Sequence, residues 1–290
     1  MSFEKFPHID NRTKDELRKH GITGLFPIQA KTFDYIYNGE DLIARDLTGS
    51  GKTMAFALPI VERMRKNKSF DSPDKNRVII LTPTRELATQ VQQEIEKLKH
   101  FRSEFKVTCI YGGVPYDRQE RDLLQGSDII VGTTGRFMDH MRRIKFNLKN
   151  VEAVILDEAD RMLDMGFAPD INEIMNKVKY DSEKKPQFVL FSATIPTWVK
   201  QVARTYLNKE HQFVDLVKNL KNKTAKSVVH MSIPCEDENK INALADVMKS
   251  HYEPDIKIIV FTETKMEAND ILNSKALKSI GSGSGRVGVQ

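Results

Sequence analysis

Short runs rich in β-branched residues alternate with amphipathic segments, and this alternation constrains the fold more than any other feature of the chain. Several runs are apolar throughout, which is typical of strands that are covered on both faces. Strands that alternate with helices form βαβ units with parallel pairing and right-handed crossovers. We therefore expect an α/β fold with a mainly parallel sheet between helices, and ligands beyond the carboxyl ends of its strands. The expected strands are residues 41–45, 77–82, 105–111, 128–132, 151–157 and 187–193.

The segment ARDLTGSGKT, residues 44–53, follows the first expected strand and precedes a helical pattern. A phosphate-binding loop in this setting reads G-x-x-x-x-G-K-[ST]. Its N–H groups and the helix N-terminus hold phosphates, its lysine reaches the β- and γ-phosphates, and its hydroxyl, here on Thr53, binds Mg²⁺. A glycine-rich turn before a surface helix is the alternative interpretation. The residues expected to bind the nucleotide phosphates in this loop are Thr48, Gly49, Ser50, Gly51, Lys52 and Thr53.

Asp46 stands where the loop consensus has its first glycine. An aspartate beside a triphosphate should weaken binding, because like charges repel each other. The rest of the loop is intact. The carboxylate avoids this cost if it points away from the phosphates, caps loop N–H groups or pairs with Arg45, and we expect it to point away or to be paired.

An apolar run, residues 153–156, ends in two acids, Asp157 and Glu158. A carboxylate at the end of a buried strand beside a phosphate loop holds Mg²⁺ through water, because this ion loses its water reluctantly. The following glutamate would orient and deprotonate the attacking water. The alternative is a strand followed by an acidic helix N-terminus, where Asp and Glu are favoured anyway. Because the phosphate loop is present as well, we expect Lys52, Asp157 and Glu158 to be catalytic.

Residues 157–160 read DEAD, and with this motif the chain resembles the DEAD-box ATP-dependent RNA helicases. The resemblance covers about residues 3–215 and continues more weakly to about 275. Within it, the segments LFPIQAKTF (25–33) and FTETK are most similar to the nucleolar Gu-type branch of the family. That branch favours the nucleus or nucleolus over the cytoplasm. The other family motifs, in the family's order, are PTRELA (83–88), Gly112-Gly113, TTGR (133–136) and SAT (192–194).

The resemblance implies a domain organisation. It implies a first RecA-like P-loop NTPase domain over residues 1–216, with a glutamine motif at 21–29, and a linker over 217–226. The start of an incomplete second RecA-like domain is expected over 227–275, with strands at 227–234 and 255–264 and helices at 236–251 and 264–277. A flexible tail is expected over 276–290.

The resemblance also implies roles for individual residues. Gln29 would read the adenine edge, since an amide both donates and accepts. Phe3, or alternatively Phe6, would stack on the base, although either ring could instead pack the N-terminal segment. The residues implied to contact the RNA backbone, without sequence preference, are Arg85, Gly113, Thr133, Gly135 and Arg136. The residues implied to couple nucleotide state to RNA binding, through hydrogen bonds to the DEAD segment, are Ser192 and Thr194.

Further departures from the family pattern concern the chain's activity. Leu25-Phe26 replace the usual Pro-Thr of the glutamine motif, and Thr134 replaces the proline of T-P-G-R. The sequence ends before the H-R-x-G-R-x-G-R motif, whose arginines stabilise charge on the γ-phosphate. We expect an RNA helicase that uses ATP and Mg²⁺. The alternative is a truncated fragment that binds ATP and RNA but unwinds little alone, and a P-loop ATPase acting on DNA or protein is a third interpretation.

Composition agrees with a globular protein that binds a polyanion. The net charge is +5, and 29% of the residues are charged. Two distant cysteines provide neither a disulfide framework nor zinc spacing, so a reducing, intracellular compartment is expected. No apolar run approaches the roughly 18 residues that span a bilayer, so no membrane partner is expected.

Overall fold

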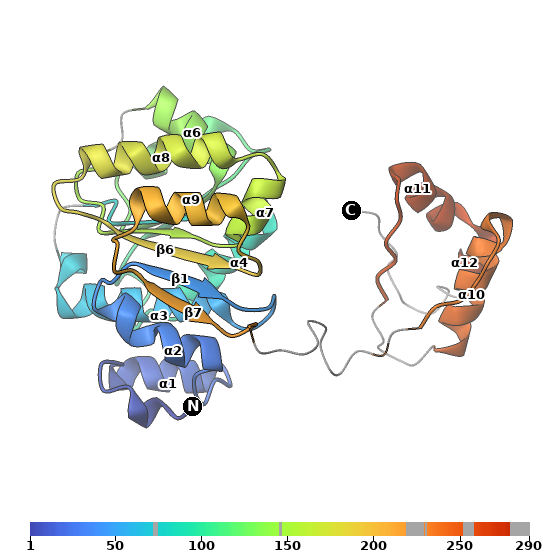
Figure 1. The fold of residues 1–290 in the computed structure, drawn as a ribbon, viewed down its shortest axis with the longest axis horizontal. Helices are drawn as coiled ribbons and strands as arrows, with labels where there is room; N and C mark the ends of the chain where they lie inside the picture. Colours follow the sequence, from blue (N-terminus) through green and yellow to red (C-terminus); the bar gives the residue numbers. More distant parts are fainter. Residues whose placement is uncertain (72–74, 145–146, 219–228, 230, 252–257, 279–290) are drawn as a thin grey trace. The chain divides into compact units, whose positions relative to one another are not determined.

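The computed structural model describes the chain except residues 72–74, 145–146, 219–228, 230, 252–257 and 279–290 (Figure 1). The chain separates into two compact units, residues 1–223 and 224–290. This division falls within the expected linker, of which residues 219–226 lie outside the described part, as do residues 279–290 of the expected tail.

The first unit contains a seven-stranded sheet in which every neighbouring pair of strands is parallel, as expected. The strand order is β3-β4-β2-β5-β6-β1-β7. All six expected strands form. The seventh strand was not expected, because its short sequence, QFVD, is not an apolar run. It lies at the edge of the sheet, where Phe213 stays 53% exposed. The strands are β1 Leu42–Arg45, β2 Val78–Thr82, β3 Val107–Ile110, β4 Ile129–Thr133, β5 Ala153–Leu156, β6 Gln187–Ser192 and β7 Gln212–Asp215.

Helices cover both faces of this sheet, and Figure 1 shows α8 and α9 on the opposite side from α2 and α3. Alternate strand residues face opposite ways, as the period of a strand requires. In β2, Ile80 enters the core beneath α3 and α4, whereas Ile79 enters the core beneath α6, α8 and α9. The helices of this unit are α1 Asn11–Lys19, α2 Pro27–Tyr37, α3 Lys52–Lys66, α4 Arg85–Glu96, α5 Tyr116–Leu124, α6 Thr134–Arg143, α7 Ala159–Asp164, α8 Ala168–Asp181 and α9 Thr197–Tyr206, with short 3-10 turns η1 Phe3–Lys5 and η2 Ser69–Asp71.

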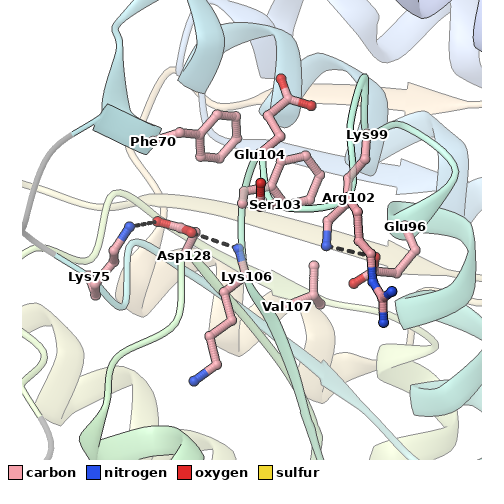
Figure 2. A pocket seen from close by; sticks show the side chains of 11 residues that line it. Phe70, Lys75, Glu96, Lys99, Arg102, Ser103, Glu104, Lys106, Val107 and Asp128 are labelled. Atoms are coloured by element: carbon pink, nitrogen blue, oxygen red, sulfur yellow. Dashed lines mark hydrogen bonds and ion pairs between the residues drawn. The ribbon is translucent and has the colours of Figure 1, made fainter.

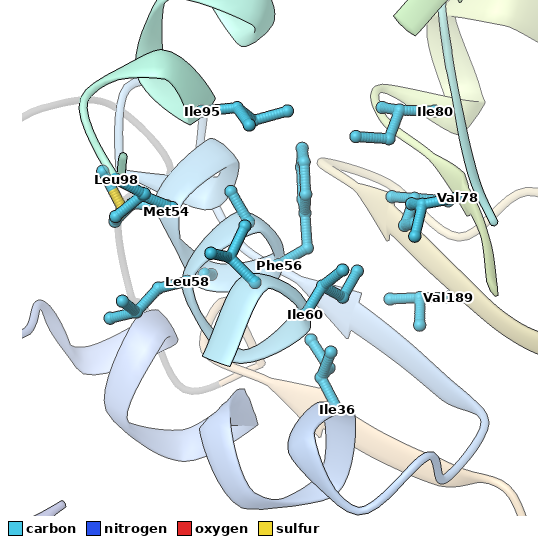
Figure 3. Close-up of a cluster of buried hydrophobic side chains, with 14 of the residues drawn as sticks. Ile36, Met54, Phe56, Leu58, Ile60, Val78, Ile80, Ile95, Leu98 and Val189 are labelled. Carbon is cyan, nitrogen blue, oxygen red and sulfur yellow. The ribbon is translucent and has the colours of Figure 1, made fainter. Parts of the chain in front are cut away.

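Helix α3 is almost entirely buried, and this fixes the loop that precedes it. Figure 3 shows Phe56 of α3 among Val78 and Ile80 of β2 and Ile95 of α4. The Phe56 ring also lies 5.5 Å from the ring of Phe191 on β6. Because β1 and α3 are both held by this core, the turn between them has little freedom.

The second unit contains the two expected helices and little core. Its elements are η3 Asp237–Asn239, α10 Lys240–Ser250, α11 Lys265–Asn273 and α12 Lys275–Lys278. The described parts of 227–234 and 255–264, where strands were expected, form none. Strands need neighbours for their backbone groups, and the described residues of this unit supply no such neighbour and bury only Ala245.

Candidate active site

The strand order brings the expected site residues to one edge of the sheet. The segments after β1, β5 and β6 lie beside one another, and they carry the phosphate loop, the DEAD acids and the SAT motif. The segments after β2, β3 and β4 form a second neighbouring group, which carries the residues expected to contact RNA. Since β2 pairs with β5, the two groups adjoin along a single edge.

The phosphate loop requires glycine at its last position. Gly51 has φ +85° and Gly49 has φ +75°, in the left-handed region that favours glycine. A Cβ atom on Gly51 would lie only 2.6 Å from Nε2 of Gln29. Helix α3 begins directly after Gly51 and has no side-chain cap, so its first N–H groups remain available to an anion.

Lys52 is buried and is held by carbonyl groups of its own loop. Its ammonium group donates to the backbone oxygens of Leu47, at 2.9 Å, and Asp46, at 3.1 Å. The side chain is therefore directed into the loop's concave side. Phosphate oxygens entering that space would replace neutral carbonyl acceptors with charged ones, and charge-assisted hydrogen bonds are the stronger kind.

Asp46 caps the loop and is not paired with Arg45. Its carboxylate accepts a hydrogen bond from the N–H of Leu47 at 2.8 Å, and the side chain is 8% exposed. Its own N–H donates to the Ser192 carbonyl. Arg45 does not pair with it and instead forms an ion pair with Asp215 at 3.3 Å. The aspartate therefore stabilises the loop that its charge was expected to disturb.

Asp157 is a buried carboxyl at the end of β5. Burial raises its pKa to about 7, although the nearby Lys52 ammonium opposes the shift. A buried carboxylate and the Thr53 hydroxyl, in the first turn of α3, are the hard oxygen donors that Mg²⁺ prefers. No cage of three or more metal-binding His, Cys, Asp or Glu side chains occurs among the described residues. A Mg²⁺ ion that binds together with a nucleotide does not need such a cage, because it is usually bound by one or two carboxylates together with substrate phosphates.

Glu158 has an unusual backbone conformation. Its φ of +53° and ψ of +51° are left-handed, which costs a residue other than glycine about 1 kcal/mol. This turn ends β5 and starts α7, and it leaves the carboxylate partly exposed, in an ion pair with Arg161 at 3.3 Å. The arrangement gives the edge one buried acid and one accessible acid in consecutive positions.

The SAT motif makes the hydrogen bonds that were expected to the DEAD segment. The Asp160 carboxylate accepts from both the N–H and the hydroxyl of Thr194, each at 2.8 Å. The Ser192 hydroxyl accepts from the N–H of Asp160 at 3.2 Å. Burial alone would raise the pKa of Asp160, but the hydrogen bonds from Thr194 and Ser192 outweigh it and lower that pKa.

Gln29 holds the phosphate loop and keeps capacity for a ligand. Its Nε2 donates to the Gly51 carbonyl at 3.0 Å, and its Oε1 accepts from the N–H of Phe26 at 2.8 Å. A primary amide has two N–H donors and an oxygen with two lone pairs. One donor and one acceptor site therefore remain, which matches the paired donor and acceptor on the edge of adenine.

The aromatic residues near Gln29 are placed differently from the expectation. Phe3 is 1% exposed and Phe6 is 5% exposed, with the Phe6 ring packed 5.3 Å from the ring of Phe33. In this conformation both rings pack the N-terminal segment, and neither offers a free face to a base. Phe26, which replaces the family's usual threonine, is 60% exposed. Its Cδ2 lies 2.8 Å from the position that a Cβ on Gly51 would take.

Four of the residues expected to contact RNA are at least partly exposed at the second part of the edge. Arg85 is exposed at the start of α4, with its guanidinium 4.7 Å from the ring centre of Tyr111. Gly113 is exposed and has φ +83°, so it needs glycine. Thr133 precedes α6, and its hydroxyl makes no capping hydrogen bond. Gly135 lies in the first turn of α6 and is partly exposed.

Arg136 does not lie where a direct RNA contact would need it. It is 8% exposed, and its guanidinium donates to the Val114 carbonyl at 2.9 Å and to Oε1 of Gln119 at 3.3 Å. The ring of Tyr116 covers it at 4.0 Å. The physical reason is local, because α6 turns this side chain back toward the loop after β3. Sequence reasoning missed Gln119 and Tyr116, since neither belongs to a recognised motif.

A hollow of about 410 Å³ lies away from these residues, at the amino ends of β3 and β4 (Figure 2). Two of its cations are already paired, Lys75 with Asp128 and Lys99 with Glu96, each at 2.7 Å. Two further cations, Arg102 and Lys106, line the hollow, but none of the motif residues does. We place the functional site at the opposite, carboxyl edge of the sheet, where the motifs meet.

Comparisons with known proteins agree with this geometry. Residues 26–202 match the family described as DEAD/DEAH box helicase. The chain is 39% identical over 279 residues to ATP-dependent RNA helicase DDX50 of Homo sapiens, which covers 96% of this chain and 37% of that protein. It is 40% identical over 282 residues to nucleolar RNA helicase 2 of Rattus norvegicus, covering 96% and 35%. The chain thus spans about a third of the length of these curated relatives.

Solved structures give the same fold. A DEAD box protein from the hyperthermophile Methanococcus jannaschii has a TM-score of 0.65 and 32% identity, over 97% of this chain and 71% of that one. A hypothetical ATP-dependent RNA helicase from Sulfolobus tokodaii has a TM-score of 0.60 and 31% identity, over 71% of this chain and 57% of that one. Among the described residues, no helix has the length and apolar character needed to cross a membrane.

Proposed function

Because the chain belongs to the DEAD/DEAH box helicase family, we propose that it is part of an ATP-dependent RNA helicase, which binds ATP–Mg²⁺ and the RNA backbone and remodels RNA. The adjacency of the two groups of loops along one sheet edge carries this proposal. One group has the buried lysine, glycine turn and acids of a nucleotide site, and the other has an exposed arginine, glycines and a free hydroxyl. A single edge of this kind suits two ligands that influence each other.

In the nucleotide site, the phosphates would lie against the N–H groups between Thr48 and Thr53, with Lys52 at the β- and γ-phosphates. Asp157 and Thr53 would hold Mg²⁺, which supplies positive charge against the charge that develops on the phosphates. Asp157 must lose its proton to do so, and the approach of a cation favours that loss. Gln29 would bind the adenine edge, and the exposed ring of Phe26 is better placed than Phe3 to contact the base.

Glu158 would act on the attacking water. Its partly exposed carboxylate can accept a hydrogen bond and then a proton from a water that faces the γ-phosphate. The left-handed turn is the feature that aims the side chain away from the buried end of β5. Ser192 and Thr194 would transmit the state of this segment, because both are bonded to Asp160, two residues further along the chain.

RNA would bind through its phosphates at Arg85, Gly113, Thr133 and Gly135, with Arg136 acting from behind the loop. Such contacts carry no sequence information, so RNA of any sequence would serve. The names of two relatives state that they are nucleolar or RNA helicases. On that basis we propose an intracellular location, with the nucleus or nucleolus favoured over the cytoplasm.

A second candidate is that this chain alone binds ATP and RNA without unwinding. The second unit favours it, because its described residues bury only Ala245 and hold no strand. A short RNA duplex with a labelled strand separates the two candidates. Strand release that needs ATP supports the helicase, whereas ATP-dependent binding without release supports the second candidate.

The binding part of the proposal is tested by equilibrium binding of ATP–Mg²⁺ and of single-stranded RNA, with single-stranded DNA as competitor. We expect Lys52→Ala to weaken ATP binding at least tenfold without changing the thermal unfolding midpoint by more than a few degrees. RNA affinity should fall steeply with salt, as it does for phosphate contacts. A clear preference for DNA, or an RNA affinity that ignores salt, would contradict the proposal.

A further inference from the structure

The loop between β3 and α5, residues 111–114, is held at both of its ends by buried side chains. At the first end, Nε2 of Gln119 donates to the Tyr111 carbonyl at 3.2 Å. At the second end, Arg136 donates to the Val114 carbonyl at 2.9 Å. The two glycines between these points, Gly112 and Gly113, are exposed and lie in open space. A Cβ on Gly112 would have no neighbour within 4 Å, and one on Gly113 would meet only Arg85, at 4.0 Å.

Gln119 is the centre of this arrangement. Its Oε1 accepts from Arg136 at 3.3 Å and from Nε2 of His140 at 3.0 Å, while its Nε2 serves the loop. Gln119 is 6% exposed and His140 is fully buried. Burial, with the nearby Arg136 charge, lowers the pKa of His140. Nε2 of the ring is the donor in this contact, because the amide oxygen can only accept. Three hydrogen bonds therefore fix which way the Gln119 amide points.

Tyr116 closes the arrangement from the outside. Its ring lies between two guanidinium groups, with Arg136 at 4.0 Å and Arg143 at 4.4 Å from the ring centre. Its hydroxyl donates to Asp139 at 2.9 Å. The ring covers the buried Arg136, which strengthens that residue's hydrogen bonds by excluding water. The Arg136 guanidinium is thus held by two oxygen acceptors, on Val114 and Gln119, and its planar face is covered by the Tyr116 ring.

We infer that Gln119 and Tyr116 are positioning residues for RNA, which set the shape of the Tyr111–Val114 loop without touching the ligand themselves. The inference rests on the proposed RNA-binding function. A pair of glycines has more backbone freedom to lose on binding than any other residues, so an unclamped loop would bind phosphates weakly. Fixing both ends in advance removes part of that cost before RNA arrives.

The inference also accounts for Arg136. An arginine of this motif would be assigned to an RNA phosphate from sequence alone, yet here its guanidinium is buried and its Nη1 donates to Val114 and Gln119. Its effect on RNA would pass through the carbonyl of Val114. A lysine could reach a phosphate as a point charge, but it lacks the planar guanidinium that lies over the Tyr116 ring here.

The test compares four variants with the wild-type chain: Tyr116→Leu, Tyr116→Phe, Gln119→Met and the matched control Tyr180→Leu, whose side chain is 92% exposed on α8. For each, the dissociation constants for single-stranded RNA and for ATP–Mg²⁺ are measured, together with the thermal unfolding midpoint. We expect Tyr116→Leu and Gln119→Met to weaken RNA binding about tenfold, with ATP affinity unchanged within about twofold. Tyr116→Phe keeps the ring and should keep wild-type RNA affinity, as should Tyr180→Leu.

Each result decides. Wild-type RNA affinity in a folded Tyr116→Leu protein overturns the inference, and so does an equal loss in Tyr116→Phe, which would place the hydroxyl on the RNA. Equal losses of RNA and ATP affinity would show a general structural role and also overturn it. If the wild-type chain itself binds no RNA, the proposed function fails instead. If Gln119→Met does not fold, the Tyr116 pair alone decides the matter.

Discussion

The buried carboxyl of Asp157 predicts that asparagine at this position stabilises the ligand-free protein while it weakens ATP–Mg²⁺ binding. Burial raises the pKa of Asp157 from 3.8 to about 7, against the opposing effect of Lys52. The folded protein therefore holds this proton more tightly than the unfolded chain does. The stability that the group contributes is complete below about pH 4 and is lost as the pH rises through 7.

The magnitude follows from the size of the shift. A pKa difference of about three units corresponds to about 4 kcal/mol, since each unit is worth about 1.4 kcal/mol. This is an upper bound, because a buried site relaxes and admits water when it ionises. Asparagine has nearly the same shape and no charge, so Asp157→Asn should raise the free energy of unfolding by about 1–4 kcal/mol at pH 8 and by less at pH 5.

The assay is urea unfolding without nucleotide or Mg²⁺, at pH 5 and at pH 8. A shift of the unfolding midpoint reports a change in stability when the dependence of the unfolding free energy on urea concentration is the same in both proteins. Asp160→Asn is the matched control and should have the opposite sign. Its carboxylate accepts two hydrogen bonds from Thr194, so its loss should cost about 2 kcal/mol at pH 8. The reasoning is refuted if Asp157→Asn destabilises the protein at pH 8, or if its gain is the same at both pH values.

Three further substitutions test the nucleotide site. Phe26→Ala should weaken ATP binding roughly three- to tenfold but leave inorganic tripolyphosphate binding unchanged, because only the base contacts the ring; equal losses for both ligands would contradict the role of this ring. Gly51→Ala should weaken ATP binding at least about tenfold, because its Cβ would meet Gln29. The control Gly21→Ala, at φ +76° and with nothing within 4 Å of its Cβ, should lower only the stability of the protein. Calorimetric titration of both variants with ATP checks this, and equal ATP affinities would count against it. Asp46→Ala should change ATP affinity by less than about threefold while it lowers the unfolding midpoint; a tenfold gain, about 1.4 kcal/mol, would mean that the carboxylate faces the phosphates.

Sequence patterns were sufficient for the parts of the fold that depend on burial. The six expected strands are apolar runs because helices cover both faces of the sheet, and such runs are visible in any sequence. Strand β7 lies at a sheet edge, as β3 does, but its Phe213 is exposed, so it leaves no such pattern. In the second unit the runs are equally apolar, yet they form no strands in their described parts, because propensity without a neighbouring strand does not make a sheet.

The site was predictable where a residue's role follows from its own backbone and not where it depends on a distant contact. Gly51 and Lys52 belong to a local turn that is formed by consecutive residues, so its function can be recognised from a contiguous motif. The expectations for Phe3 and Arg136 assumed accessible side chains, but Phe3 is buried in the hydrophobic core and Arg136 is covered by the ring of Tyr116. The departure at Phe26 was visible in the sequence, whereas its exposure beside Gly51 needed the structure.

The central claim is that one edge of this sheet joins ATP hydrolysis to RNA binding, and the rate of ATP hydrolysis with and without single-stranded RNA tests it most directly. We predict hydrolysis that requires Mg²⁺, rises when RNA is added and falls at least a hundredfold in Glu158→Gln, a variant that keeps ATP and RNA affinity. Hydrolysis that persists in Glu158→Gln, or that is indifferent to RNA while RNA is bound, would contradict the account.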